Sequence, residues 1–375
     1  MSYESYYKEL QISGKYRQLS NTYSGCLDFS TNDYLGLSKN QELLNAAHIA
    51  GEQHGVGATG SRLLSGNKKI FEELEAQIAL DKGTEAALIF NSGFQANITV
   101  LSSLLDTKVL GKKPLVFFDR LNHSSLYQAI FLSGAELVRY RHNDMQHLSD
   151  LLLKFKLIDR PKFIVTETIF GMDGDVLLIN DLLNIAEQYA AFVYLDEAHA
   201  TGVVGTNGYG LSAKLDFKNI PHLLMGTFSK ALGCCGAYVA TSKVIKNYLI
   251  NKAPGFIYST ALSPMIIGAV LKAWNMIGTM ENQRKILFSN ADNLRINLQR
   301  LGCNTGLSKS HIIPVILGGE ELTIKKTKYL LNNNIIVSCV RPPTVPIGTS
   351  RLRIAINANH SIEDIQQLID GFKKL

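Results

Sequence analysis

GTFSK at residues 226–230 is the stretch that decides the fold, because it follows an apolar run at residues 223–225 that predicts a buried strand. A second apolar run, FVYL at residues 192–195, is followed in the same way by DEAH at residues 196–199. In open α/β sheets, ligands bind beyond the carboxyl ends of the strands. We therefore expect the two strands to bring a carboxylate, an imidazole, hydroxyls and one amine to one edge of a sheet.

These side chains match the needs of pyridoxal phosphate (PLP), which takes an anion at its pyridine nitrogen, donors at its phosphate and a lysine at its aldehyde. Lys230 is the only charged residue between residues 225 and 241, and uncharged surroundings lower the pKa of an amine and make it a nucleophile. We assign Lys230 to the Schiff base; the alternative is a lysine at the rim of the core whose amine reaches water. Asp196 is assigned to the pyridine nitrogen rather than to a helix cap, and Thr227 to the phosphate. His199 is assigned to the ring hydroxyl or to a packing contact at the ring edge; a structural histidine is the alternative.

A third strand end carries a candidate phosphate site. Residues 87–90 predict a strand, and NSGF at residues 91–94 leads from it into a helix that starts near residue 95. The N–H groups at a helix N-terminus bind phosphate, and Gly93 lets the backbone approach closely. An ordinary strand-to-helix turn is the alternative.

His123 follows the predicted strand at residues 115–118. We predict that it lies flat on the cofactor ring, with Asp119 or Ser124 fixing its orientation; a histidine in a plain turn is the alternative. Glu167, after the next strand, is interpreted as a loop residue.

Two arginines lie close together near the C-terminus, Arg351 and Arg353. On a strand they point the same way. Arginine is the natural bidentate partner of a carboxylate. We assign Arg353 to a substrate carboxylate and Arg351 to a structural salt bridge.

Strands and amphipathic helices alternate from about residue 42 to about residue 259. Near-continuous apolar strands separated by helices predict an α/β fold, with a mostly parallel sheet covered by helices on both faces. After residue 263 a long helix is predicted from residue 265 to residue 301, and the strands and helices that follow it predict a smaller α+β domain. The expected domains are an N-terminal segment 1–36, a large PLP-binding domain 37–262 and a small C-terminal domain 263–375.

Composition excludes several classes of protein. Hydrophobic residues make up 46% and charged residues 19% of the 375 residues, as in a globular protein, and no apolar run has membrane-spanning length. The start of the chain does not predict a signal peptide, so we expect a cytoplasmic location and no membrane partner. The net charge of +6 is scattered, which predicts no nucleic-acid partner.

Metal binding and helicase activity are not expected either. The five cysteines lack a paired metal spacing and predict reduced thiols. MDGD at residues 172–175 lacks the remaining ligands of a calcium loop. DEAH also occurs in helicases, but the chain has no phosphate-binding loop of the P-loop type.

Taken together, the motifs resemble those of the α-oxoamine synthases, PLP enzymes of fold type I. The resemblance covers nearly the whole chain and rests on STNDYLGL at 30–37, GSR at 60–62, SGF at 92–94, HSS at 123–125, HND at 142–144, MDGD at 172–175, DEAH at 196–199, TFSK at 227–230, YST at 258–260 and the stretch 341–353. These enzymes condense an amino acid with an acyl thioester and release carbon dioxide. The resemblance therefore implies an acyltransferase that uses PLP.

The resemblance also implies a role for each matching residue. Lys230, His123, Asp196 and His199 are the implied catalytic residues, and all four also touch the cofactor. Further cofactor-binding residues are Ser92, Gly93, Phe94, Thr227 and Ser229, with Ser259 and Thr260 reaching the phosphate from the partner subunit. A homodimer with shared active sites is therefore implied. Asn32 and Arg353 are similar to the residues that hold the amino-acid carboxylate, and Thr344 lies close to the acyl substrate.

Within the family, the motifs are most similar to those of the member that joins L-alanine to a pimeloyl thioester in biotin biosynthesis. The acyl group arrives on coenzyme A or on acyl carrier protein. The alternative is a sister enzyme that uses glycine or serine with another acyl-CoA. An aminotransferase and a cofactor-binding protein with a vestigial site are more distant alternatives. Two departures from the family pattern are Phe71, where many relatives carry histidine, and Gly171, where serine is frequent.

Overall fold

The computed structural model describes residues 2–12, 16, 17, 19 and 25–374 and divides the chain into two compact units. Unit 1 contains Met1–Tyr34, Gly171–Asp175 and Lys285–Leu375, and unit 2 contains Leu35–Phe170 and Val176–Arg284. This division differs from the predicted domain boundary at residue 262. Helix α11 (Pro264–Ile277) packs along α2 (Gln41–His54), and this contact keeps α11 in unit 2.

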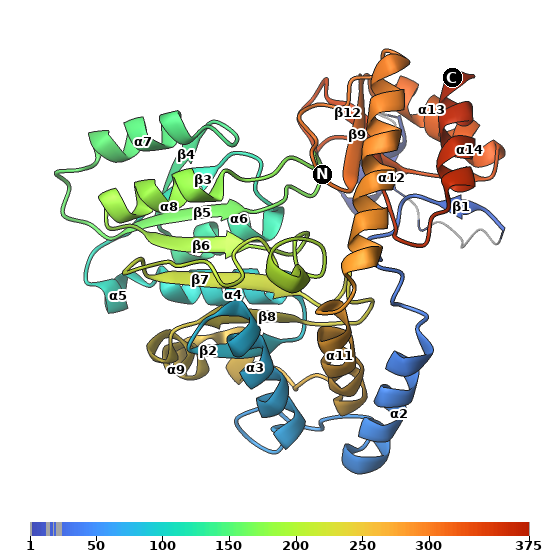
Figure 1. The fold of residues 1–375 in the computed structure, drawn as a ribbon. Helices are drawn as coiled ribbons and strands as arrows, with labels where there is room; N and C mark the ends of the chain where they lie inside the picture. The colour runs from blue at the N-terminus through green and yellow to red at the C-terminus, as the bar shows by residue number, and fades with distance from the viewer. Residues whose placement is uncertain (1, 13–15, 18, 20–24, 375) are drawn as a thin grey trace. The chain divides into compact units, whose positions relative to one another are not determined.

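Unit 2 is built on a seven-stranded sheet with the order β2-β8-β7-β6-β5-β3-β4 (Figure 1). The strands are β2 Ala86–Phe90, β3 Leu115–Asp119, β4 Glu136–Tyr140, β5 Lys162–Glu167, β6 Phe192–Asp196, β7 His222–Thr227 and β8 Ala237–Thr241. All neighbours are parallel except β8, which runs antiparallel to both β2 and β7. The connection from β7 to β8, residues 228–236, is too short for the crossover that a parallel pair needs. The predicted mostly parallel sheet is confirmed.

Helices pack on the sheet because its strands are apolar on both faces. Strands β2 and β3 are buried at every position. Alternate strand residues, among them Val116, Phe118, Leu223 and Met225, form one buried cluster with helices α4 and α6. The α-helices of unit 2 between α2 and α11 are α3 Lys69–Lys82, α4 Gly93–Leu104, α5 Thr107–Leu110, α6 Ser124–Ser133, α7 Met145–Lys154, α8 Ile179–Gln188, α9 Lys243–Lys252 and α10 Pro254–Ile257.

The prediction of one long helix from residue 265 to residue 301 is wrong. It consists of α11 and α12 (Glu281–Arg300), which are separated by residues 278–280. Glycine is a poor helix former, and Gly278 ends α11. A Cβ atom at Gly278 would lie 2.7 Å from the Tyr209 hydroxyl. The apolar pattern continues on both sides of the break and therefore conceals it.

Unit 1 holds a three-stranded antiparallel sheet in the order β11-β12-β9, formed by Ser338–Val340, Ser350–Ala355 and Ile312–Gly318. The short strands β1 (Leu27–Asp28) and β10 (Ile335–Ile336) form a separate parallel pair. Helices α1 (Tyr3–Ile12), α13 (Glu320–Asn332) and α14 (Ile362–Lys373) also belong to this unit. The mixture of strands and helices is the expected α+β arrangement.

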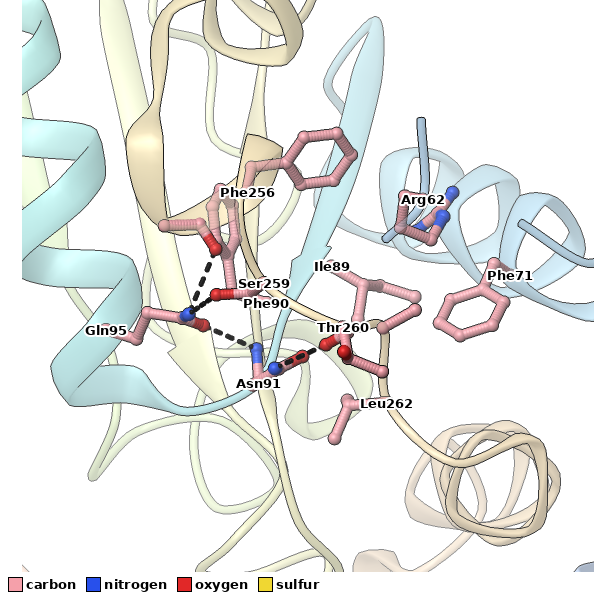
Figure 2. Close-up of a pocket in the computed structure, with 12 residues that line it drawn as sticks. Arg62, Phe71, Ile89, Phe90, Asn91, Gln95, Phe256, Ser259, Thr260 and Leu262 are labelled. Atoms are coloured by element: carbon pink, nitrogen blue, oxygen red, sulfur yellow. Dashed lines mark hydrogen bonds between the residues drawn. The ribbon is translucent and has the colours of Figure 1, made fainter. Parts of the chain in front are cut away.

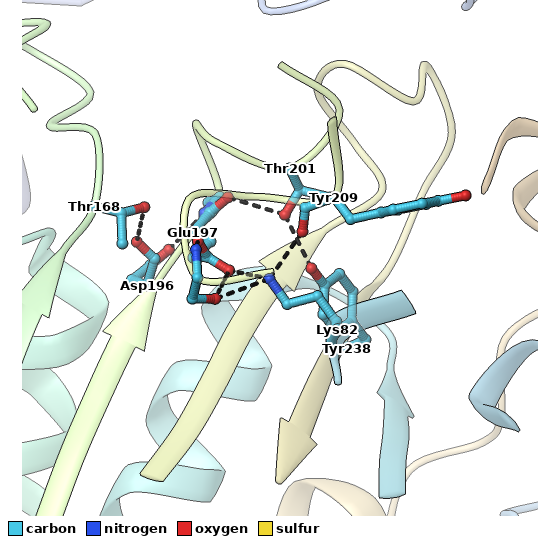
Figure 3. A network of polar contacts seen from close by, with 9 residues as sticks. Lys82, Thr168, Asp196, Glu197, Thr201, Tyr209 and Tyr238 are labelled. Carbon is cyan, nitrogen blue, oxygen red and sulfur yellow. Dashed lines mark hydrogen bonds and ion pairs between the residues drawn. The ribbon is translucent and has the colours of Figure 1, made fainter. Parts of the chain in front are cut away.

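A buried ion pair in unit 2 fixes the loop that follows β6 (Figure 3). Lys82, in the last turn of α3, donates to the Glu197 carboxylate, to the carbonyl oxygen of Tyr209 at 2.8 Å and to the hydroxyl of Ser212 at 3.0 Å. Both charged side chains are fully buried. Burial lowers the pKa of Lys82, and Glu197 acts in the opposite direction. Gly210, at φ +102°, has no room for a side chain, because a Cβ atom would lie 2.7 Å from Glu197 and 2.8 Å from Lys82.

We expect Lys82→Met to lower the free energy of unfolding by about 3–5 kcal/mol, because it leaves a buried carboxylate without its cation. Lys69→Met is the matched control, since Lys69 lies on the same helix with 85% of its side chain exposed. Urea unfolding of both variants, followed by circular dichroism, measures the difference. Equal midpoints for the two variants would show that the ion pair contributes nothing to stability.

Candidate active site

Four polar residues end neighbouring strands at one edge of the unit 2 sheet: Asp119 on β3, Glu167 on β5, Asp196 on β6 and Thr227 on β7. Glu167 and Asp196 are register partners across β5 and β6. Because the carboxyl ends of parallel strands share an edge, side chains far apart in the sequence converge here. The structure thus brings together the two stretches, DEAH and TFSK, from which the prediction started.

Asp196 is a buried carboxylate held by two donors. Its Oδ2 atom accepts from the side-chain amide of Asn97 at 2.8 Å, and its Oδ1 atom accepts from the backbone N–H of Ala198 at 2.9 Å. Asn97, on α4, also contacts Ser125 at 2.9 Å and the Tyr194 hydroxyl at 2.8 Å. These donors stabilise the anion, which is the form that a pyridine nitrogen would need.

Lys230 lies next to His199. The Lys230 Nζ atom is 2.7 Å from His199 Nε2, and His199 is buried. Lys230 belongs to the short connection between β7 and β8, and the backbone N–H of Gly233 donates to the Lys230 carbonyl at 2.9 Å. The amine and the imidazole, thirty-one residues apart in sequence, therefore face each other at the sheet edge.

The residues predicted to bind the phosphate lie where β7 ends and α4 begins. The Thr227 hydroxyl donates to the Gly236 carbonyl at 2.9 Å and lies 2.7 Å from the Ser229 hydroxyl. Ser92 caps α4 by accepting from the N–H of Gln95, so the amides of Gly93 and Phe94 form the first turn. A Cβ atom at Gly93 would lie 3.8 Å from Thr227 Cβ, at ordinary contact distance. The protein itself thus leaves room for at least a methyl group in front of this helix N-terminus.

Ser259 and Thr260 lie beside the same helix turn of their own chain (Figure 2). The side-chain amide of Gln95 donates to Ser259 Oγ at 2.7 Å and to the Gly255 carbonyl at 2.9 Å. Asn91 donates to the Thr260 carbonyl at 2.8 Å.

Arg62 and Phe71 line the pocket that these residues share. The Arg62 guanidinium lies over the Phe71 ring, 4.4 Å from its centroid. Phe71, a departure from the family pattern, is therefore a buried partner of a cation.

His123 caps α6, and its orientation is fixed by residues other than those predicted. Its Nδ1 atom is 2.7 Å from the hydroxyl of Ser125, whereas Asp119 or Ser124 was expected. Asp119 instead contacts the His142 ring at 2.9 Å and the backbone N–H of Asn143 at 2.7 Å. The sequence pattern does not show which way the His123 side chain turns at the start of α6, so its partner Ser125 was not predicted.

Glu167 was interpreted as a loop residue, and this is wrong: it is the buried last residue of β5. Its carboxyl group accepts from the backbone N–H of His123 at 2.6 Å. Burial raises the pKa of Glu167 well above its usual range, and the neighbouring charge of Asp196 adds to this shift. The signal was available, because Glu167 follows an apolar strand just as Asp196 does.

The predicted substrate residues belong to unit 1. Arg353, on β12, is buried and donates to Asn32 Oδ1 at 3.0 Å and to the Gly171 carbonyl at 2.5 Å. Arg351 forms an ion pair with Asp173, so the predicted salt bridge is confirmed. Thr344 lies in an exposed loop, where its hydroxyl accepts from Arg17 at 3.0 Å.

The donor set fits PLP. A buried anion, a lysine, a histidine beside it, and a helix N-terminus next to a threonine hydroxyl are the groups that the cofactor requires. Among the described residues, no group of three or more His, Cys, Asp or Glu side chains is placed to hold a metal ion. Over the same residues, none of the helices is long and apolar enough to cross a bilayer. The five cysteines are free thiols, and Cys235 is exposed.

Comparisons with known proteins agree with this site. The family model for aminotransferase class I and II matches residues 24–372. Proteins with the provisional name 8-amino-7-oxononanoate synthase are 47% identical in Paramagnetospirillum magneticum, covering 92% of this chain and 86% of the relative, and 42% identical in Magnetococcus marinus, covering 97% and 94%.

Solved structures show the same fold. An SPT structure with the PLP internal aldimine has a TM-score of 0.89 and 27% identity, covering 99% of this chain and 96% of that one. The 8-amino-7-oxononanoate synthase of Francisella tularensis has a TM-score of 0.80 and 30% identity, covering 94% and 98%. The chain therefore belongs to the aminotransferase class I and II family, among the acyl-transferring PLP enzymes related to 8-amino-7-oxononanoate synthase.

Proposed function

We propose that this enzyme condenses L-alanine with a pimeloyl thioester, carried by coenzyme A or by acyl carrier protein, to form 8-amino-7-oxononanoate, carbon dioxide and the free thiol. The observation that carries the proposal is the Lys230 amine beside His199 at the edge where Asp196 is buried, in a chain 47% identical to a relative with that provisional name. When bound, PLP supplies an electron sink for the bonds at the substrate's α-carbon.

Lys230 is proposed to hold the cofactor covalently and then to move the α-proton of alanine. Lys230 would suit the role of general base at this position, because its flexible stem gives the amine reach while the sheet edge holds its backbone. His199 is proposed to donate to the ring hydroxyl of the cofactor. It is also proposed to orient the Lys230 amine, since Lys230 Nζ and His199 Nε2 are 2.7 Å apart. Asp196 is proposed to bind the protonated pyridine nitrogen.

His123 is proposed to stack on the cofactor ring, while Ser92, Gly93, Phe94, Thr227 and Ser229 surround its phosphate. Ser259 and Thr260 are proposed to complete the phosphate site of the partner subunit in a homodimer. Their contacts with Gln95 and Asn91 keep this segment ordered within its own chain. Analytical ultracentrifugation with and without PLP tests the dimer, and a monomer in both conditions would contradict it.

Arg353 and Asn32 are proposed to hold the carboxylate of alanine, and Thr344 to lie near the acyl substrate. The Arg353 guanidinium is pre-oriented by Asn32 and the Gly171 carbonyl. Fixing both partners before the substrate arrives lowers the entropy lost on binding.

A sister reaction with glycine or serine and another acyl-CoA is the second candidate. A serine palmitoyltransferase of Sphingomonas wittichii has a TM-score of 0.90 with 25% identity over 99% of this chain and 96% of that one. Incubating the PLP-loaded enzyme with alanine, glycine or serine and either pimeloyl-CoA or palmitoyl-CoA, and identifying products by mass, separates the candidates. A product from alanine and pimeloyl-CoA alone supports the first, and a product from serine and palmitoyl-CoA alone supports the second.

Lys230→Ala is expected to lower kcat by at least about 10²–10⁴-fold, because it removes both the covalent anchor and the base. Borohydride reduction followed by peptide mass analysis should mark the peptide with Lys230 in the wild-type protein and leave the variant unmarked. Lys243→Ala, which removes an exposed lysine, is the control and should keep both the mark and the activity. Turnover by the Lys230 variant at the wild-type rate would reject the assignment.

Gly93→Ala is expected to raise the dissociation constant of PLP about tenfold or more, which corresponds to about 1.4 kcal/mol. The added methyl group meets no close protein atom but occupies the space in front of the α4 N-terminus. The protein should therefore stay folded, because alanine suits a helix better than glycine. Gly319→Ala, at a site with nothing within 4 Å, is the control for PLP titration. An unchanged affinity would place the phosphate elsewhere.

Arg353→Lys should raise the KM for alanine by about tenfold or more, since lysine keeps the charge but cannot form the bidentate pair with a carboxylate, and a hydrogen bond to a charged group contributes about 1.5–3 kcal/mol. The affinity for PLP should stay the same. Arg351→Lys, on the same strand, keeps the charge beside Asp173 and should leave this KM within about threefold. Steady-state kinetics with varied alanine measures both, and equal effects of the two substitutions would argue against a carboxylate site at Arg353.

A further inference from the structure

Asn97 is the centre of a buried polar network that joins two of the proposed cofactor-contacting residues. Its side-chain amide donates to Asp196 Oδ2 at 2.8 Å and to Ser125 Oγ at 2.9 Å, and its carbonyl oxygen accepts from the Tyr194 hydroxyl at 2.8 Å. Ser125 Oγ in turn lies 2.7 Å from His123 Nδ1. Asn97, Ser125 and Tyr194 are all buried, so water does not compete for these hydrogen bonds.

The hydrogen atoms of this network can be assigned from Asp196 outward. An ionised carboxylate only accepts, so the group of Asn97 that faces it must be the amide NH₂. The second hydrogen of that NH₂ points to Ser125 Oγ, which therefore accepts. The Ser125 hydroxyl hydrogen is then available for His123 Nδ1, and the Ser125 backbone N–H also donates to Nδ1 at 3.3 Å. Nδ1 thus receives two donors and carries no proton.

We propose that Asn97 and Ser125 are positioning residues that hold His123 as a neutral imidazole with its proton on Nε2. The proposal rests on the proposed function, in which His123 stacks on the cofactor ring. A neutral ring avoids placing a second positive charge against a pyridine that Asp196 keeps protonated. It also leaves His123 with a single N–H donor, on the ring edge away from α6.

The charges around His123 are consistent with a neutral ring. Burial of the ring is the main cause that lowers the pKa of His123, although part of the residue is exposed. The charge of Asp196 acts in the opposite direction, and that of Lys230 lowers the pKa further. The Glu167 carboxyl accepts from the His123 backbone N–H and not from the ring. A donor to Nδ1 stabilises the neutral form, so loss of the Ser125 hydroxyl raises the pKa of His123.

The test is nitrogen NMR of the PLP-loaded enzyme with ¹⁵N-labelled histidine. Nine histidines contribute signals, and His123→Asn identifies those of His123 by difference. The wild-type spectrum should show an unprotonated Nδ1 and a protonated Nε2 at pH 7. In Ser125→Ala the signals should shift toward a mixture of tautomers, and the midpoint of their pH titration should rise. Ser124→Ala, an exposed neighbour on the same helix turn, is the matched control and should match the wild type.

Asn97→Ala provides a second test, since it cuts the network one bond earlier and should produce the same change in tautomer. A protonated Nδ1 in the wild-type enzyme, or unchanged signals in both Ser125→Ala and Asn97→Ala, would overturn the proposal. Borohydride marking of Lys230 and product formation from alanine are measured on the same samples. These two measurements test the proposed function separately from the tautomer. Marking or product formation can fail while His123 has the expected tautomer, and both can succeed while it does not.

Discussion

The pairing of a buried carboxylate with donors from a distant helix is the interaction on which the site depends. Asp196 ends a strand in the middle of the sheet, where its charge would be costly without partners. Asn97 and the Ala198 amide supply them. Because Asn97 lies on α4, the helix whose first turn begins at Gly93, one helix joins the two ends of the proposed cofactor site. Asp196 and the proposed phosphate-binding turn are therefore linked through the same helix.

A second buried carboxylate, that of Glu197, fixes the loop that follows Asp196. Glu197, the residue after Asp196, turns away from the sheet edge toward Lys82 and Ser212. Adjacent carboxylates thus serve different purposes: Asp196 faces the proposed ligand, and Glu197 anchors the loop. His199 lies in the turn that follows these two anchored carboxylates, which explains how it meets Lys230 from another strand end.

Much of the fold could be predicted from the sequence, since apolar strands and amphipathic helices differ in period. The positions of Lys230, Asp196 and Thr227 at strand ends followed from the same pattern. The partners of individual side chains could not be predicted from that pattern. Asn97 looks like any polar residue of a helix, and Lys82 like a surface lysine in a last turn, until packing shows which way each points. The break at Gly278 was hidden because the apolar stripe continues across it.

The tight return from β7 to β8 has a consequence for how such an enzyme can change. Residues 228–236 must close an antiparallel pair while carrying the proposed Schiff-base lysine. The Phe228 N–H is bonded to the Gly236 carbonyl, and the Cys234 N–H to the Phe228 carbonyl, both at 2.9 Å. Because the loop is bonded to itself in this way, any reach that the nitrogen needs during turnover comes from rotations within its own hydrocarbon stem. An insertion in this segment would therefore displace the amine from the sheet edge, whereas replacements elsewhere on the sheet rim would leave it in place.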